Sequence, residues 1–387
     1  MPADLNHLSN EEIDLLIERY YNGEKTTDLI SEFKINAKPS QLVKLFPPRI
    51  SDILCKYCGL TMIQYYSSRS YGNGITSPEC QNCGHEEDKF CRCKNCQNAI
   101  FIKQQQERLA KQVFIKDYLS RIAIEPIYIS ELNLEQKIYL GAFLRAGISE
   151  NFDFVKPIEQ FIEPLAPTEK LSSEILKILF NRERRIISVS PSSDVEAFTN
   201  IENPEEGITF LTNKVQWQIN ITSETLNKIP LIESIINPES FELDSYWSYL
   251  FWKKIALHEC LEFFNYSIES IFRSEYSIGE KTIATFEELL KYYSVSEIYN
   301  IINNATTNAA RFKLEHTVSN KHAINTIIGK ALSYGEKALA EKWQIKKFHR
   351  RHELPKSVLS KFFFDRILKI GDRGFYEKPQ ILELQNL

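Results

Sequence analysis

Apolar residues recur at helical spacing along most of this chain of 387 residues. Near its start, Ser9 and Glu12 form a capping-box pattern, and an apolar stripe follows from Ile13 to Tyr20. The same spacing predicts further helices over residues 132–146, 239–275, 281–293, 294–312, 319–342 and 355–369. We therefore expect a mainly α, multi-domain protein with a large helical C-terminal region.

Two shorter helices are predicted after the first one. One begins after the cap Thr27 and ends at Phe33. The other begins at Pro39, a favoured first position of a helix, and is stopped by Pro47 and Pro48. The short link between the two helices has the length expected of a helix-turn-helix.

Residues 9–48 resemble the helix-turn-helix class of DNA-binding modules. The resemblance implies that the third helix is the recognition helix, with Ser40, Gln41 and Lys44 facing phosphates or base edges. The first fifty residues hold six basic and eight acidic side chains, which is unfavourable for attraction to phosphate. A three-helix module that binds protein therefore stays open as the alternative.

Seven of the eight cysteines lie between Cys55 and Cys96, and the first four form the pairs Cys55/Cys58 and Cys80/Cys83. Two Cys-x-x-Cys pairs bring four thiolates to the corners of a tetrahedron, which a structural zinc site requires. A glycine follows each pair and permits a tight turn in which backbone amides point at the sulfurs. In this the segment resembles the knuckles of rubredoxin-type zinc ribbons, and at least one zinc site is predicted.

His85, Cys91, Cys93 and Cys96 can supply a second zinc site. Spacing leaves the partition of ligands open, because the third cysteine pair can join either of the earlier ones. Disulfides or a redox Cys-x-x-Cys motif are the alternatives, but no apolar signal-peptide region and no βαβ pattern is visible. We therefore expect a reducing, cytoplasmic location. Cys260 stands alone and is expected to be a buried helix residue.

Between the first two cysteine pairs, β-branched and aromatic residues run from Met62 to Tyr71 and precede a Gly-Asn-Gly turn. This pattern predicts a hairpin between the two knuckles. The hairpin carries Tyr65, Tyr66 and Arg69, which are suited to stacking on bases. The alternative is that the tyrosines cover a small metal domain that lacks a core of its own.

Composition shifts divide the chain into five segments. A stretch rich in Ser, Pro and Asn marks the clearest boundary, and an alternating, strand-like pattern follows it. The predicted segments are a helix-turn-helix-like region (1–50), a zinc ribbon (51–97), a helical connector and middle domain (98–186), a loop-rich boundary (187–215) and a helical C-terminal domain with a basic surface (216–387). No apolar run approaches the roughly 18 residues that a membrane span requires, so we expect a soluble protein without membrane contact.

The net charge of −4 hides a strong asymmetry along the chain. Residues 151–300 hold 13 Lys and Arg against 24 Asp and Glu, whereas residues 311–376 hold 15 against 6. The basic end interleaves cations with aromatic rings, which supplies phosphate contacts and stacking platforms together. The residues expected to contact nucleic acid there are Lys321, Lys330, Lys346, Lys347, Arg350 and Arg351. The alternative is that the basic end neutralises the acidic middle of the chain.

Motifs for catalysis are nearly absent. His258 and Glu259 lack the second histidine of a zinc-protease helix, and no glycine-rich phosphate loop occurs. Arg311 and His316 resemble the Arg-x-x-x-x-His signature of the HEPN ribonuclease superfamily, although Phe312 follows the arginine where that family prefers a polar residue. The resemblance implies that the pair acts on the 2′-hydroxyl and the scissile phosphate of RNA across a dimer.

Together these features favour a zinc-ribbon protein that binds nucleic acid without catalysis of its own, as a regulator or a targeting subunit of a larger complex. DNA is favoured over RNA, and further protein partners are expected. Mobile-element or phage-defence systems are compatible settings. Two alternatives stay open: a HEPN-like RNase that uses Arg311 and His316, and a protein-interaction scaffold.

Overall fold

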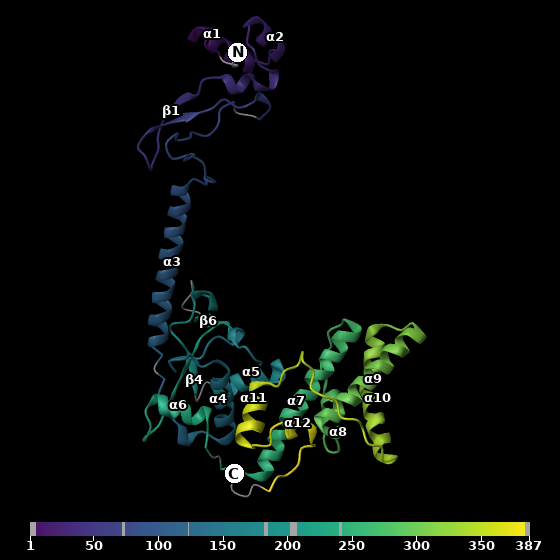
Figure 1. Cartoon of the computed structure of the whole chain (residues 1–387). Helices are drawn as coiled ribbons and strands as arrows, with labels where there is room; N and C mark the ends of the chain where they lie inside the picture. Colours follow the sequence, from purple (N-terminus) through teal and green to yellow (C-terminus); the bar gives the residue numbers. More distant parts are fainter. Residues whose placement is uncertain are drawn as a thin grey trace. The chain divides into compact units, whose positions relative to one another are not determined.

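The structure is a computed structural model that describes residues 5–71, 74–122, 124–181, 185–201, 207–239 and 242–383. Over these residues the protein is mainly α, as the sequence predicts (Figure 1). The chain divides into two compact units, Met1–Lys111 and Gln112–Leu387. The division falls within the long helix α3 (Lys94–Ser120), which includes the predicted connecting helix. In the described part of the chain, no helix combines the length and the apolar character that crossing a membrane requires.

The first unit begins with short helices and continues into a small hairpin. Its elements before α3 are α1 (Asn10–Tyr21), α2 (Thr26–Glu32), the 3-10 helix η1 (Pro39–Leu45), β1 (Arg49–Leu54), β2 (Thr61–Gln64) and the 3-10 turn η2 (Arg69–Tyr71). The capping box that predicts α1 is confirmed: Glu12 N donates to Ser9 Oγ over 3.2 Å, and Ser9 N donates to the Glu12 carboxylate over 2.7 Å. Leucines from the three helical elements pack into one small core.

The second and third helices differ from their predictions. Helix α2 begins at Thr26 with Lys25 as its cap, because the hydroxyl of Thr27 donates to Asp28 instead of capping the helix. The segment that starts at Pro39 is a 3-10 helix of seven residues and not an α-helix. The prolines that follow it force the chain into an extended conformation after seven residues, so the segment ends before a longer helix can form.

Antiparallel strands β1 and β2 pair around the first cysteine pair. Beyond β2 the chain continues the predicted hairpin, since Tyr66 forms a bridge to Ile75 and Ile63 forms one to Glu79. The two residues at the tip of the predicted turn, 72 and 73, lie outside the described residues.

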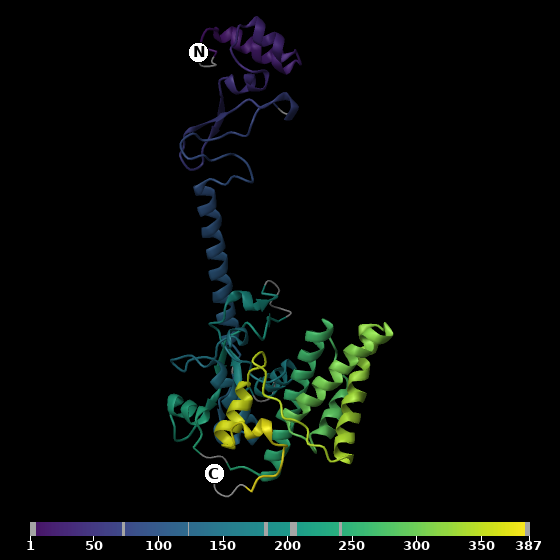
Figure 2. The same cartoon turned by 45° about the vertical axis from the view of Figure 1, so that its right-hand side comes forward.

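The second unit contains most of the helices. They are α4 (Leu134–Gly147), α5 (Glu169–Leu179), α6 (Lys228–Ile236), α7 (Ser245–Phe272), α8 (Glu280–Leu289), α9 (Val295–His316), α10 (Asn320–Ala340), α11 (Val358–Lys361), the π-helical segment η7 (Phe362–Ile367) and α12 (Arg373–Tyr376). Helix α9 packs between α7 and α10, and Figures 1 and 2 show the three side by side. The helices predicted over residues 132–146, 281–293, 294–312 and 319–342 are confirmed to within four residues at each end. The helix predicted over 239–275 begins six residues later, at Ser245, and the one predicted over 355–369 is the short helix α11 followed by the π-helical segment η7.

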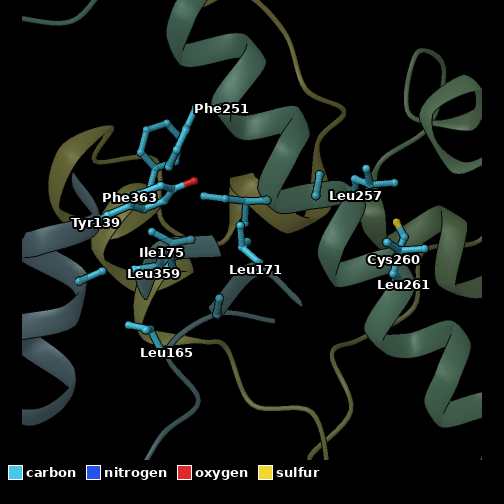
Figure 3. Close-up of a cluster of buried hydrophobic side chains, with 14 of the residues drawn as sticks. Tyr139, Leu165, Leu171, Ile175, Phe251, Leu257, Cys260, Leu261, Leu359 and Phe363 are labelled. Carbon is cyan, nitrogen blue, oxygen red and sulfur yellow. The ribbon is translucent and has the colours of Figure 1, made fainter. Parts of the chain in front are cut away.

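Helix α7 lies at the centre of the hydrophobic core. Cys260 is fully buried on it, as predicted. Figure 3 shows part of the core, where side chains of α4, α5, α7, α11 and η7 gather: Tyr139, Leu171, Ile175, Phe251, Leu257, Leu261, Leu359 and Phe363. The apolar stripes read from the sequence are therefore the faces that these helices bury.

Short strands and 3-10 turns complete the second unit. They are β3 (Ile127–Tyr128), η3 (Ile129–Glu131), η4 (Ile158–Gln160), β4 (Ile187–Val189), η5 (Val195–Ala197), β5 (Phe198–Thr199), β6 (Thr209–Phe210), β7 (Trp217–Ile219) and β8 (Ile221–Thr222). The pairs β4–β7 and β5–β6 are antiparallel, and β3–β8 is parallel. The segment 187–215, expected to be loop-rich, contains three of these strands and lies inside the second unit. The finer division into five segments stays a prediction.

Candidate metal centres

Four cysteine sulfurs meet at the base of the hairpin in the first unit. The ligand atoms of Cys55, Cys58, Cys80 and Cys83 all lie within 4.8 Å of one another, and Sγ of Cys55 is 3.6 Å from Sγ of Cys83. Zinc–sulfur bonds of about 2.3 Å in a tetrahedron place neighbouring sulfurs about 3.8 Å apart. This first cluster therefore has the geometry of a four-coordinate zinc site.

Both cysteine pairs of the first cluster adopt the same tight turn. Gly59 and Gly84 have φ angles of 66° and 64°, a left-handed conformation that favours glycine. Each glycine N–H donates over 2.8 Å to the carbonyl oxygen of the first cysteine of its pair, Cys55 or Cys80. The tight turn predicted at the two glycines is confirmed.

A second cluster forms from His85, Cys91, Cys93 and Cys96. His85 Nδ1 lies 3.3 Å from Sγ of Cys91, 3.9 Å from Sγ of Cys93 and 3.4 Å from Sγ of Cys96. A tetrahedral zinc ion with one imidazole and three thiolates requires nitrogen–sulfur distances of about 3.6 Å. The third cysteine pair therefore joins His85, which resolves the partition that spacing left open.

The carboxylate of Glu87 orients the histidine of the second cluster. His85 is 1% exposed, and its Nε2 lies 3.3 Å from Glu87 Oε2. Because Nδ1 faces the sulfurs, Nε2 is the nitrogen that carries the proton and donates to the carboxylate. Such a carboxylate fixes the tautomer and the orientation of a metal-binding imidazole.

Two polar side chains inside the cysteine pairs donate to ligand sulfurs. Tyr57 Oη donates to Cys96 Sγ over 3.4 Å, and Asn82 Nδ2 donates to Cys58 Sγ over 3.3 Å. Tyr57 thus connects the first pair to the second cluster. Sequence reasoning missed both residues, although their positions between two ligand cysteines place them near the sulfurs.

Backbone amides shift the acidity of the thiols in both clusters. The N–H groups of Cys83 and Asn82 lower the pKa of Cys80 to about 7. Burial raises the pKa of Cys91, but the N–H groups of Cys93 and Glu86 outweigh it and bring the value to about 6. Metal binds to the thiolate form of cysteine. The lowered pKa values of Cys80 and Cys91 therefore favour metal binding near neutral pH.

All four positions around each centre are occupied by protein ligands. Zinc sites of this closed kind are structural, because no coordination position is left for water or a substrate. The two clusters can therefore each hold a zinc ion and stabilise the local fold, without supplying metal-centred catalysis.

No protein family matches this chain, and neither does any curated protein or solved structure. The helix-turn-helix, zinc-ribbon and HEPN resemblances accordingly stay predictions from short motifs. Fold by itself does not assign a function. The positions of the residues predicted to contact nucleic acid are therefore the remaining structural guide to function.

The residues of the predicted recognition helix lie as expected on the 3-10 helix η1. Ser40, Gln41 and Lys44 are exposed, while Leu42 and Phe46 are buried beneath them. A segment of this length offers a short exposed face with one cation.

Arg69 joins the N-terminal helices to the hairpin. Its Nη1 donates to the carbonyl oxygens of Tyr20 and Glu24 over 2.8 and 2.7 Å, and its guanidinium lies over the Tyr20 ring. The Arg69 guanidinium therefore already uses the N–H groups and the flat face with which it would contact a base. Tyr65 is 42% exposed, whereas Tyr66 packs against the aromatic rings of the helical core. We therefore leave Arg69 and Tyr66 out of the proposed interface.

Helices α9 and α10 bring several of the predicted residues together. The ring of Phe312 lies 4.7 Å from the His316 ring and 5.9 Å from the His322 ring, and Lys330 Nζ lies 5.0 Å above it. We call this part of α9 and α10 the Phe312 patch. It consists of the contacting residues Phe312, His316, His322 and Lys330 and of their sequence neighbours Arg311, Lys313 and Lys321. The patch contains both residues of the HEPN-like signature and two of the predicted nucleic-acid contacts.

The second basic group lies on the segment that follows α10. Lys346, Lys347 and Arg351 are exposed, as a role in contacting phosphate requires. Hydrogen bonds to α9 hold this segment in place: Asn300 Nδ2 donates to the carbonyl oxygen of Lys346, and Ser296 Oγ donates to that of Phe348.

Arg350 has a different role from the one predicted. Its Nη2 donates over 2.9 Å to the carboxylate of Glu259, which is fully buried, and its guanidinium lies 4.4 Å from the centre of the Phe375 ring. A guanidinium in such a pair cannot turn outward without leaving a buried carboxylate uncompensated. With the Lys361–Glu163 pair, this contact supports the alternative that part of the basic end neutralises the acidic middle.

Proposed function

We propose that this chain is a zinc-containing nucleic-acid-binding protein without catalysis of its own, acting as a regulator or targeting subunit. Two closed sets of Cys and His ligands support the zinc ions, since thiolate and imidazole ligands in a tetrahedron suit zinc. The zinc ions hold the first unit folded. Nucleic acid is then bound by surface side chains, with DNA as the favoured form.

The Phe312 patch is the observation that carries the binding function. Residues 311–330 hold four Lys and Arg against one Asp and Glu. Arg311, Lys321, His316 and His322 are exposed on it. Cations supply attraction to phosphates, and flat rings among them supply stacking surfaces. Phosphates are offered by single and double strands alike, whereas stacking faces are offered by unpaired bases.

A salt titration tests this proposal. Binding of a fluorescent duplex DNA oligonucleotide should weaken steeply as salt rises, because each neutralised phosphate contributes roughly −0.9 to the log–log slope for duplex DNA. The double variant Arg311→Gln/Lys321→Gln should reduce that slope by about 2. Fluorescence anisotropy measures both affinity and slope.

The double variant Lys281→Gln/Lys378→Gln is the matched control, since it removes the same charge from exposed positions outside the patch. It should keep the slope of the native protein. Equal slopes in the two double variants would move the interface away from α9 and α10. Absence of DNA binding at low salt would favour the protein-interaction scaffold.

An RNA-cleavage assay on the same protein preparation distinguishes our proposal from the HEPN-like alternative. We expect no cleavage of RNA by the native protein. Cleavage that is lost in both Arg311→Ala and His316→Ala would replace our proposal with a nuclease, because a histidine acting as acid or base contributes about 10²- to 10⁴-fold to rate.

A further inference from the structure

A cavity of about 400 Å³ opens in the second unit between the start of α5 and the middle of α7. It shares no lining residue with the Phe312 patch or with either metal cluster. The side chains that face it come from α5, α7 and two later loops: Thr168, Glu169, Lys170, His258, Leu261, Glu262, Asn265, Tyr266, Glu269, Ile278 and Leu354. Its volume falls within the range of small-molecule sites.

His258 presents one free ring nitrogen to this cavity. The residue is only 7% exposed, and its Nδ1 shares a hydrogen bond of 2.6 Å with Oγ1 of Thr168. Thr168 also caps α5, which fixes the hydroxyl in position. Burial lowers the pKa of His258 to about 4, so the imidazole is neutral. Its Nε2 has no hydrogen-bond partner among the described residues.

Glu262 lies one helical turn beyond His258 and also lacks a partner. Its Oε2 is buried without any hydrogen bond within the described chain. The neighbouring Glu259 is paired with Arg350 Nη2 and Ser360, while Arg350 Nη1 is buried without a hydrogen bond. No hydrogen bond joins Arg350 to Glu262 in the described chain, so the Glu262 carboxyl group can still accept a donor from a ligand.

The remaining lining indicates the chemistry of that donor. Three acidic side chains, Glu169, Glu262 and Glu269, face the cavity with Lys170 as the one cation among its described lining residues. Glu262 holds a proton while the cavity is empty and must release it to pair with an ammonium group, so the lining favours a positively charged ligand that displaces this proton. Leu261, Ile278 and Leu354 supply apolar walls between the charged groups. A ligand that fits must therefore combine ammonium groups with an aliphatic body.

The positions of two glutamates set the length of the ligand. Glu262 and Glu269 are seven residues apart on α7, which places them on one face and about 10.5 Å apart along the axis. We propose that the cavity binds a linear aliphatic polyamine, with one terminal ammonium between Glu262 and His258 Nε2 and another at Glu269. The chain between the ammonium groups lies along the apolar walls.

Calorimetric titration of the full-length protein, freed of nucleic acid, with spermidine tests this site. We expect saturable binding with a Kd of roughly 10–100 µM. Butylamine, which has one ammonium group, should bind at least about tenfold more weakly. Glu262→Gln and Glu269→Gln should each weaken spermidine binding by about tenfold or more, because each removes a charge-assisted hydrogen bond.

Glu287→Gln is the matched control, since Glu287 is exposed on α8 and does not face the cavity. It should bind spermidine like the native protein. Tryptophan fluorescence reports whether each variant is folded, because all four tryptophans lie in the second unit. Absence of saturable binding, or equal affinity in all three variants, would overturn the proposal. Neither result bears on DNA binding by the Phe312 patch.

Discussion

At the scale of single residues, groups that are not ligands prepare the second metal cluster. Glu86 N donates to Cys91 Sγ over 3.2 Å, Cys96 N donates to Cys93 Sγ over 3.4 Å, and Glu87 fixes the imidazole. Hydrogen bonds to the charged form of a thiol favour the thiolate. The affinity of the cluster for metal therefore depends on these neighbours as well as on its four ligands.

Glu87→Ala should weaken zinc binding at the second cluster by about tenfold, since loss of such a carboxylate typically costs 10–100-fold. Competition with a chromophoric chelator measures the effect. Glu86→Ala is the control, because that side chain is exposed and makes no contact with His85. Equal zinc affinity in the two variants would contradict the role that we assign to Glu87.

The buried carboxyl group of Glu262 should make the second unit sensitive to pH. Burial, with a smaller contribution from Glu259, raises its pKa from 4.5 to about 8. The folded chain thus holds a proton that the unfolded chain has lost, and this stabilisation is complete below pH 4.5 and disappears as pH rises through 8. Between pH 6.5 and 8 the free energy of unfolding should fall by on the order of 2 kcal/mol.

Urea unfolding followed by tryptophan fluorescence checks this dependence. Glu262→Gln keeps an uncharged group of the same shape, so its stability should change little over the same pH window. A native protein whose stability is flat or rises between pH 6.5 and 8 would show that this carboxyl group is ionised in the fold.

At the scale of elements, close approach between α4 and η7 depends on a glycine. A Cβ atom at Gly141 would lie 2.4 Å from the Phe362 ring, whereas a Cβ atom at Gly329 on α10 would meet nothing within 4 Å. Alanine is the better helix former, so the two replacements separate packing from helix propensity.

Gly141→Ala should destabilise the second unit by about 1–3 kcal/mol through overpacking. Gly329→Ala, its control, should stabilise it by roughly 0.5–1 kcal/mol. Thermal unfolding followed by tryptophan fluorescence measures both changes. A shift of the same sign in the two variants would mean that α4 and η7 are not in close contact.

The elements that sequence reasoning predicted well are those with a long periodic pattern. Helix α7 has 28 residues and α9 has 22, so many turns repeat the same apolar face. Strands such as β4 have two or three residues, which is too short for an alternating pattern to stand out among serines and prolines. The 3-10 form of η1 depends on the flanking prolines more than on its apolar residues.

At the scale of the whole molecule, the two units are stabilised differently. The second unit has a large hydrophobic core, whereas the buried hydrophobic cluster of the hairpin region in the first unit consists of Met62 and two cysteines of the first cluster. Domains with so little core usually depend on metals or disulfides. None of the eight cysteines forms a disulfide, and seven of them belong to the two clusters that could hold metal ions, so we expect bound metal to stabilise residues 49–96.

The residues of the two candidate metal clusters were largely predictable from sequence. Which basic residues are exposed was not. All eight ligands follow from cysteine spacing and His85, but their partition depends on how the hairpin places that histidine beside the third cysteine pair. The residue type and neighbours of Arg350 resemble those of exposed Arg351, and only its pairing with Glu259 separates them. Contacts between residues so distant in sequence leave no local pattern.

Native mass spectrometry of the protein purified under reducing conditions tests the two metal sites most directly. We expect the mass of the chain plus two zinc ions, and the loss of one ion in each of Cys58→Ser and Cys93→Ser, because these ligands belong to different clusters. A folded chain that carries no zinc, or a single ion that both variants retain, would contradict the account.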